Sequence, residues 1–268
     1  MNTRKLLTQA AFIGALAATT PALATIVVVN DALNAGITTF DNTVTAAGET
    51  VVTIELVSGT NTYNYIDKDG NAATMTIQSP DGTNVSWSGP DSSGSISMTG
   101  DAARIDPFTT AGEIIPGFNS GFELVFSSGV NSLGFETGDW ATCCYSNTRP
   151  QNIIDDYGVP ATGSGLWIAF DGASANLTAN ALQYSDNPGI GSGTGSDITF
   201  IAALDDSGSF NKVTFFGDGF GEVLFAGGTI RLASVDQGSL PPVGVPVPAP
   251  LALLALGLIG VAVRARKA

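Results

Sequence analysis

Apolar and polar residues alternate along most of the chain, which is typical of β-strands with one buried face. In TVVTIELV, residues 50–57, the side chains of Val52, Ile54 and Leu56 fall on one side. Between residues 25 and 244 no stretch shows a convincing period of 3.6 residues, so we predict strands and no helix there. Similar runs are GFELVF (121–126), VNSLGFE (130–136), LWIAFD (166–171), DITFIAAL (197–204), NKVTFF (211–216) and TIRLASV (229–235).

Roughly ten such runs, separated by turn residues, predict an all-β fold over residues 25–238: a single β-sandwich, jelly-roll-like in type. The rhythm breaks at 104–118 and at 141–165, but neither interval has the low complexity of a linker. We therefore predict one domain with long loops. Trp167, inside LWIAF, is expected to be buried.

Charge is distributed unevenly along the 268 residues. All 24 acidic residues lie between Asp31 and Asp236, where only five basic residues accompany them, a net charge of −19. Such a surface attracts cations and repels phosphate backbones, so no nucleic-acid partner is expected. Histidine is absent, which excludes Ser-His-Asp and Cys-His catalysis and His-ligated zinc.

The first 24 residues have the three parts of a secretory signal peptide. Arg4 and Lys5 form the basic start, residues 10–18 are apolar, and the small residues Ala22 and Ala24 precede a cut before Thr25. We therefore predict export by the secretion machinery. The rival interpretation, an uncleaved anchor, fits the short apolar core and small-residue site less well.

The other end is a proline-rich linker (239–250), an apolar segment (251–263) and a basic tail (264–268). The apolar segment is about 20 Å long as a helix, short for a membrane core of about 30 Å. Arg264, Arg266 and Lys267 are expected to act as a stop on the cytoplasmic side of the membrane.

The linker contains Val245, Pro246, Val247, Pro248 and Ala249. With this motif, the apolar segment and the basic tail, the ending resembles the PEP-CTERM sorting signal, and most closely its VPLPA-type variant. The resemblance implies an exosortase as partner, a membrane-embedded thiol enzyme that processes the tail. It also implies the cell envelope or exterior of a Gram-negative bacterium, reached across the inner membrane, in an exopolysaccharide or biofilm context. An ordinary C-terminal anchor retained whole is the alternative. Val247 stands where the commonest form of the signal has Glu.

The body also resembles, in general style, the β-rich bodies of such envelope proteins. The segments that carry this likeness are GFELVFSSGVNSLGFETGDW and FNKVTFFGDGFGEVLFAGGTIRLASV. Those bodies resemble carbohydrate-binding or adhesive modules, which implies polysaccharide as a ligand.

A candidate ligand-binding loop is DWATCCYSNTRP, residues 139–150. Its adjacent cysteines, Cys143 and Cys144, are the only two in the chain, and an oxidising exterior leaves a bridge between neighbours, bridges to other chains, or unpaired thiols. A rigid loop carrying Trp140 and Tyr145 would offer an aromatic platform to sugars. The simpler alternative, which we favour, is a structural turn whose aromatics cover a sheet end.

The candidate calcium ligands are Asp67, Asp69 and Asn71, at alternate positions of YIDKDGNAAT. The EF-hand spacing is not met, and Asp-Gly between two strand runs also indicates a hairpin turn, which we favour. Further acidic candidates of the same kind are GDGFGE (217–222) and the pair Asp205–Asp206.

Taken together, the sequence predicts a non-enzymatic envelope or matrix protein that binds polysaccharide and calcium. One alternative is a secreted carbohydrate-active enzyme that uses two glutamates. A purely structural surface protein is the other. The glutamates in or beside strands are Glu55, Glu123, Glu136 and Glu222.

Overall fold

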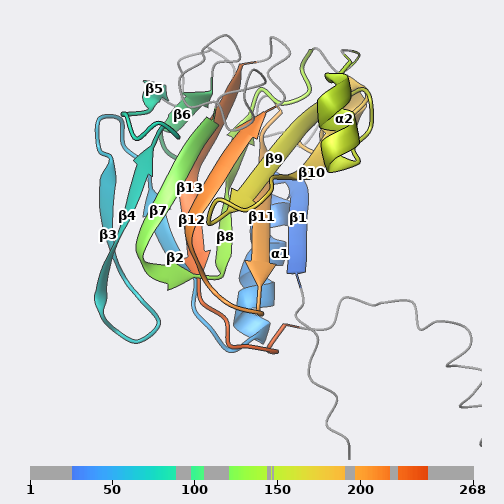
Figure 1. The fold of residues 1–268 in the computed structure, drawn as a ribbon. Coiled ribbons are helices and arrows are strands. Elements are labelled where there is room, and N and C mark those ends of the chain that lie inside the picture. Colours follow the sequence, from blue (N-terminus) through green and yellow to red (C-terminus); the bar gives the residue numbers. More distant parts are fainter. Residues whose placement is uncertain are drawn as a thin grey trace, which may run out of the picture.

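The computed structural model describes residues 26–88, 98–105, 121–143, 146, 148–190, 197–217 and 223–240. These residues form two antiparallel β-sheets and two α-helices (Figure 1). Within them, neither helix has the length and apolar character needed to cross a membrane. The all-β prediction is therefore confirmed for the sheets, and each of the seven quoted runs overlaps a strand.

The first sheet, here called sheet A, has the order β1-β11-β8-β13-β6-β5, with β2 also paired to β13. Its long central strand β13 has β8 on one side, while β6 and β2 share the other side. The bounds are β1 Ile26–Ala32, β2 Val52–Glu55, β5 Ser86–Ser88, β6 Ala102–Ile105, β8 Ser132–Gly138, β11 Thr199–Asp205 and β13 Leu224–Ala233.

The second sheet, sheet B, has the order β10-β9-β12-β7-β4-β3. Every strand pair is antiparallel, and most neighbours in the sheet are distant in sequence. The bounds are β3 Thr62–Ile66, β4 Ala72–Gln78, β7 Gly121–Val130, β9 Ser164–Phe170, β10 Asn176–Ala181 and β12 Phe210–Gly217.

One apolar core lies between the two sheets. Phe122 of β7, Phe135 of β8 and Phe215 of β12 meet at its centre, with ring centroids 4.9–5.7 Å apart. Because side chains alternate along a strand, each of these residues has neighbours that point to the outer face of its sheet. The period-two pattern of the sequence reflects this arrangement.

The helix α1 (Leu33–Ala46) covers the outer face of sheet A, beside β11 and β1 (Figure 1). The prediction of no helix is wrong here. Leu33, Phe40 and Val44 face a second apolar cluster, and Gly36 lies so close to Phe200 that a Cβ would come within 2.7 Å of it. Spacings of four and seven residues were present in the sequence, but they are carried by a threonine-rich segment of low helix propensity.

The shorter helix α2 (Gln151–Tyr157) was also missed, and it covers the outer face of sheet B. Trp167 of β9 is fully buried beneath it and stacks on Phe216, with ring centroids 5.8 Å apart. The predicted burial of Trp167 is confirmed, although its ring lies under α2 instead of between the sheets. The buried Arg149 anchors this segment through the carbonyl oxygens of Pro160 and Thr162, at 2.7 and 3.0 Å. A 3-10 helix, Tyr184–Asp186, follows β10.

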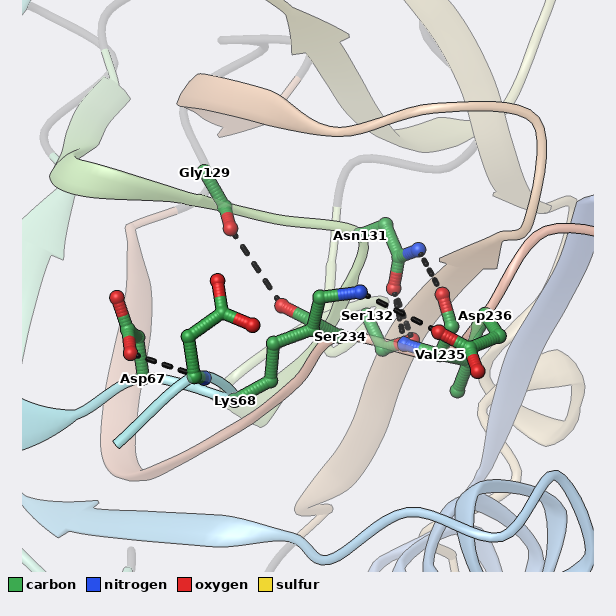
Figure 2. A network of polar contacts seen from close by, with 9 residues as sticks. Asp67, Lys68, Gly129, Asn131, Ser132, Ser234, Val235 and Asp236 are labelled. Atoms are coloured by element: carbon green, nitrogen blue, oxygen red, sulfur yellow. Dashed lines mark hydrogen bonds and ion pairs between the residues drawn. The ribbon is translucent and has the colours of Figure 1, made fainter. Parts of the chain in front are cut away.

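A single residue, Asn131, carries the chain from β7 in sheet B to β8 in sheet A. Its side-chain amide donates to the carbonyl of Val235 at 2.7 Å and accepts from the N–H of Val235 at 2.8 Å. Its backbone donates to Ala233 and accepts from Asp205. Figure 2 shows this corner, with Ser234 bonded to Gly129 and Lys68 bonded to Asp236 nearby. The side chain of Asn131 thus makes the two hydrogen bonds to Val235 that a neighbouring strand would otherwise make, at the point where the two sheets separate.

Candidate functional site

A cavity of about 500 Å³, here called the edge cavity, opens between the two sheets on one side of the sandwich. Its walls come from β9 and β10 of sheet B, from β11 of sheet A, and from β12 with the turn before it. β10 is an edge strand of sheet B, and β11 is paired to the edge strand β1 of sheet A. Figure 1 shows these edges on the same side of the molecule. The volume falls in the range of small-molecule pockets, about 300–1,000 Å³.

The floor of the edge cavity is apolar. Phe170, at the end of β9, and Phe210, at the start of β12, lie with ring centroids 4.7 Å apart and planes tilted by 42°. Ile168 and Phe170 point to this side because Trp167 and Ala169, which alternate with them, point to the α2 side. The remaining apolar lining residues are Leu177 and Ala203.

Asp171 lies at the mouth of the edge cavity, in the tight turn after β9. It adopts positive φ (49°), followed by Gly172 (76°), as a short Asp-Gly turn requires. One carboxylate oxygen, Oδ1, accepts from the N–H groups of Asn211 and Lys212 at 2.8 and 2.9 Å. These bonds fix the carboxylate against β12 and leave Oδ2 without a hydrogen bond from the described residues.

Asp205 provides a second carboxylate at the end of β11. Its Oδ1 accepts from the N–H of Ser207 at 2.8 Å and from the hydroxyl of Ser207 at 2.5 Å. Within the described part of the chain, its Oδ2 also accepts no hydrogen bond. The neighbouring Asp206 is buried instead and accepts from the N–H of Leu240 at 3.0 Å. The pair that the sequence singled out is thus divided between a cavity residue and a structural one.

No basic side chain lines the edge cavity among the described residues. Lys212 is next to Asp171 in space, but its Nζ lies 3.0 Å from Glu123 on the outer face of sheet B. The other body cations are engaged elsewhere: Lys68 with Asp236, Arg231 with Asp41, Arg149 with carbonyl oxygens, and Arg104 on β6 with partners of its own. The cavity is therefore apolar inside and negatively charged at its mouth.

The strand glutamates Glu123 and Glu136 do not share a groove. Each alternates with core residues: Glu123 follows Phe122 in sheet B, and Glu136 follows Phe135 in sheet A. The two carboxylates therefore point to opposite outer faces, with the core between them. They cannot flank one glycosidic bond as a pair of glycosidase carboxylates must. Glu55 is exposed on β2, and Glu222 lies outside the described residues.

Glu136 is fully buried beside a bulge in β13. Its carboxylate accepts from the N–H of Thr99 at 2.8 Å, from the N–H of Thr229 at 3.2 Å, and from the hydroxyl of Thr99. Burial raises the pKa of Glu136, although these donors act in the opposite direction. The contacts join residues 98–100 to β13, which indicates a structural role.

The proposed aromatic platform does not include Trp140. This residue is 1 % exposed, and its indole N–H donates to the carbonyl of Ser164 at 3.2 Å. The side chain of Asn187 holds the Trp140 carbonyl at 2.7 Å. A ring buried in this way covers the sheet end and offers no face to a ligand. Cys143 is disulfide-bonded, while Cys144 and Tyr145 lie outside the described residues.

Asp67, Asp69 and Asn71 form the turn of the β3–β4 hairpin. Oδ1 of Asp67 accepts from the N–H groups of Asp69 and Asn71 at 3.0 and 2.8 Å, and Oδ2 accepts from the hydroxyl of Ser128 at 3.0 Å. These donors lower the pKa of Asp67, the Asn71 contact most strongly. Oδ1 thus serves the hairpin turn and Oδ2 ties it to β7, and no group of three acidic or thiol side chains suited to a metal occurs among the described residues.

Several predicted sites lie outside the described residues. They are the cleavage site Ala22, Ala24 and Thr25, the sorting motif from Val245 to Ala249, and the basic residues Arg264, Arg266 and Lys267.

No protein-family model, curated protein or solved structure matches this chain. The edge cavity itself was missed at the sequence level, apart from the mention of Asp205. The strand-end motif Phe170-Asp171-Gly172 was visible as a turn signal, but nothing in it indicates that Phe210 lies 40 residues away on the same wall.

Proposed function

We propose that this chain is an exported, non-enzymatic protein of a Gram-negative envelope or extracellular matrix, whose β-rich body binds polysaccharide at the edge cavity. The observation that carries the proposal is the composition of that cavity. Its floor holds two phenylalanine rings, and its mouth holds carboxylates, hydroxyls and the amide of Asn176. A sugar ring has apolar C–H faces and a hydroxylated edge, and it fits such a surface.

Export and sorting rest on the two ends of the chain. The tripartite start and the ending with Val245–Ala249 support passage across the inner membrane, anchoring through the apolar segment 251–263, and processing by an exosortase. The jelly-roll-like winding of the body also remains a proposal, which the distant pairings of consecutive sheet neighbours support.

The binding proposal is tested by filling the edge cavity. Asn176 is exposed on β10, so Asn176→Trp should close the cavity without disturbing the core. Asn64→Trp, at an exposed position of the opposite edge strand β3, is the matched control. In calorimetry against a panel of soluble polysaccharides, we expect the Asn176 variant to bind about tenfold more weakly or worse, and the Asn64 variant to match the parent. Equal binding by both variants would place the site elsewhere. If no polysaccharide of the panel binds to the parent protein, the result would favour a purely structural protein.

The sorting proposal is tested separately in cells. Deleting residues 245–268, or replacing Pro246 and Pro248 together by alanine, should change the processing and membrane association of a tagged chain on cell fractionation. Unchanged size and location in both variants would contradict handling by an exosortase.

A further inference from the structure

We infer that the edge cavity selects a glycan unit carrying a protonated amine, that is, an amino sugar with a free amine, over neutral, N-acylated or acidic units. This inference rests on the proposed polysaccharide binding and specifies its ligand. It combines three observations: two positioned carboxylates, the lack of a basic side chain among the described residues that line the cavity, and an aromatic floor.

In each of the two carboxylates, one oxygen is held in place by hydrogen bonds and the other is not. Oδ1 of Asp171 is fixed by two N–H groups of β12, and Oδ1 of Asp205 by Ser207. Their second oxygens accept no hydrogen bond from the described residues. A carboxylate oxygen that is positioned in advance loses little conformational entropy on binding a donor. An ammonium group has three N–H donors and no acceptor, so it complements an oxygen of this kind.

Among the described residues, no basic side chain neutralises this site. The body has five basic side chains for 24 acidic residues, and none of the five lines the edge cavity. Lys212 donates its backbone N–H to Asp171, but its ammonium pairs with Glu123 on the outer face of the sheet. An anionic sugar would therefore meet repulsion from both the mouth and the whole body, whereas a cationic one would be attracted.

The aromatic floor of the edge cavity favours a positively charged ligand that is built on a sugar ring. The half-buried Phe170 offers the cavity apolar surface and the negative potential of its ring, which suits both C–H groups and a nearby ammonium, while the buried Phe210 packs against it. Around them lie the amide of Asn176 and the exposed hydroxyl of Ser209, which can pair with sugar hydroxyls, and the hydroxyl of Ser207, which donates to Asp205 and can still accept a hydrogen bond. A lysine side chain carries no hydroxyl groups and would leave these partners unused, so we favour the sugar.

The test compares two oligosaccharides that differ only in the charge of their nitrogen. The probes are the β-1,4-linked tetramer of glucosamine and the same tetramer with every amine acetylated, titrated calorimetrically at low salt and about pH 5.5, well below the pKa of an ordinary α-amine, so that the sugar amines are protonated. We expect the amine form to bind about 10- to 100-fold more tightly, as charge-assisted hydrogen bonds imply. This preference should shrink when ionic strength rises from about 20 to about 300 mM, because exposed charges are screened.

Two variants assign the effect to the cavity. Asp171→Asn and Asp205→Asn each keep a side-chain oxygen for the backbone bonds and remove the negative charge. Each should lower the affinity for the glucosamine tetramer about tenfold and leave the affinity for the acetylated tetramer unchanged. Asp69→Asn, an exposed residue of the hairpin at the opposite edge of sheet B, changes the net charge equally and should have no effect. Thermal melting of each variant checks that the fold is retained.

The possible outcomes separate this inference from the proposed function. Equal binding of both tetramers, with no effect of the two cavity variants, overturns the amine preference and leaves polysaccharide binding standing. Failure of every oligosaccharide to bind overturns both. Tighter binding of a trilysine peptide than of the glucosamine tetramer, lost in the same cavity variants, would show that the amine is read but that the ligand is not a sugar, and would overturn the inference as stated.

Discussion

Asn131 shows how one side chain can permit an abrupt change of sheet. A chain that leaves sheet B and enters sheet A within one residue leaves backbone groups of neighbouring strands without a partner. The amide of Asn131 has a donor and an acceptor on adjacent atoms, as a peptide unit does, and it pairs with both polar groups of Val235. Aspartate lacks the donor and leucine lacks both, so neither can make this pair of hydrogen bonds.

We therefore expect Asn131→Ala to destabilise the protein by about 2–5 kcal/mol, because it leaves the buried N–H and carbonyl of Val235 unpaired. Asn131→Asp should also be destabilising, since it keeps the acceptor but brings a charge next to the Val235 carbonyl. The measurement is urea denaturation of the purified protein. Asn64→Ala, at an exposed position of β3, is the control and should change stability by less than about 0.5 kcal/mol. Similar losses for both asparagines would contradict this role.

Among the elements, β13 is distinguished by a bulge that exchanges one neighbour for another. Up to Gly227 the strand pairs with β6, and from Thr229 it pairs with β2. Gly227 and Gly228 have φ of 136° and 63°, and the missing Cβ of Gly228 leaves room for the carboxylate of Glu136. The bulge, the buried glutamate and residues 98–100 thus form one structural unit.

Replacing Gly228 by alanine should therefore be costly. The new Cβ would lie 2.5 Å from Cδ of Glu136, in a backbone conformation that L-residues disfavour. We expect a loss of about 2–4 kcal/mol in thermal or urea unfolding. Gly208→Ala is the matched control, since a Cβ there meets no atom within 4 Å. If both substitutions have the same small effect, the packing between the bulge and Glu136 is not a constraint.

The buried Glu136 should also make the stability of the protein depend on pH. Its pKa is raised in the folded protein by burial, so the folded form holds the proton more tightly than the unfolded chain does. Its contribution to stability is then most favourable below the ordinary glutamate pKa of about 4.3, and it decreases as pH rises through the higher folded pKa. The free energy of unfolding of Glu136→Gln, relative to the parent, should increase between about pH 4 and pH 7. The same change in Glu55→Gln, an exposed residue on neighbouring β2, would contradict this assignment.

The strands and helices differ in how far the sequence pattern predicts them. Strands such as β9 and β12 were predictable because they are short, largely apolar runs bounded by turn residues, as expected for strands that are buried on both faces. The helix α1 was not, since its apolar stripe is narrow and its exposed positions carry Thr38, Thr39 and Thr43, whose hydroxyls bond back to the helix carbonyls. The edge cavity was not predictable either, because Asp171, Asp205 and Phe210 are brought together only by strand order.

At the scale of the whole molecule, the excess of acidic residues in the body should affect its stability. With 24 acidic residues against five basic ones between residues 31 and 236, mutual repulsion opposes the compact state, and salt should relieve it. Predicted calcium binding would add a specific contribution to this general one. The hairpin of Asp67 gives no support for such a site, since its oxygens are already occupied by protein donors.

Thermal melting in matched salts distinguishes these two contributions. We expect the midpoint to rise with ionic strength in NaCl, and CaCl2 and MgCl2 at equal ionic strength to give shifts that agree with each other, because screening and weak surface association do not discriminate strongly between the two ions. A selective site prefers calcium through its larger coordination sphere and would raise the midpoint further in CaCl2 alone. Such an excess, abolished by chelator and retained in Asp67→Asn, would show that calcium binds at residues other than the hairpin. Its loss in Asp67→Asn would mean that calcium can replace the hydrogen bonds that hold the turn.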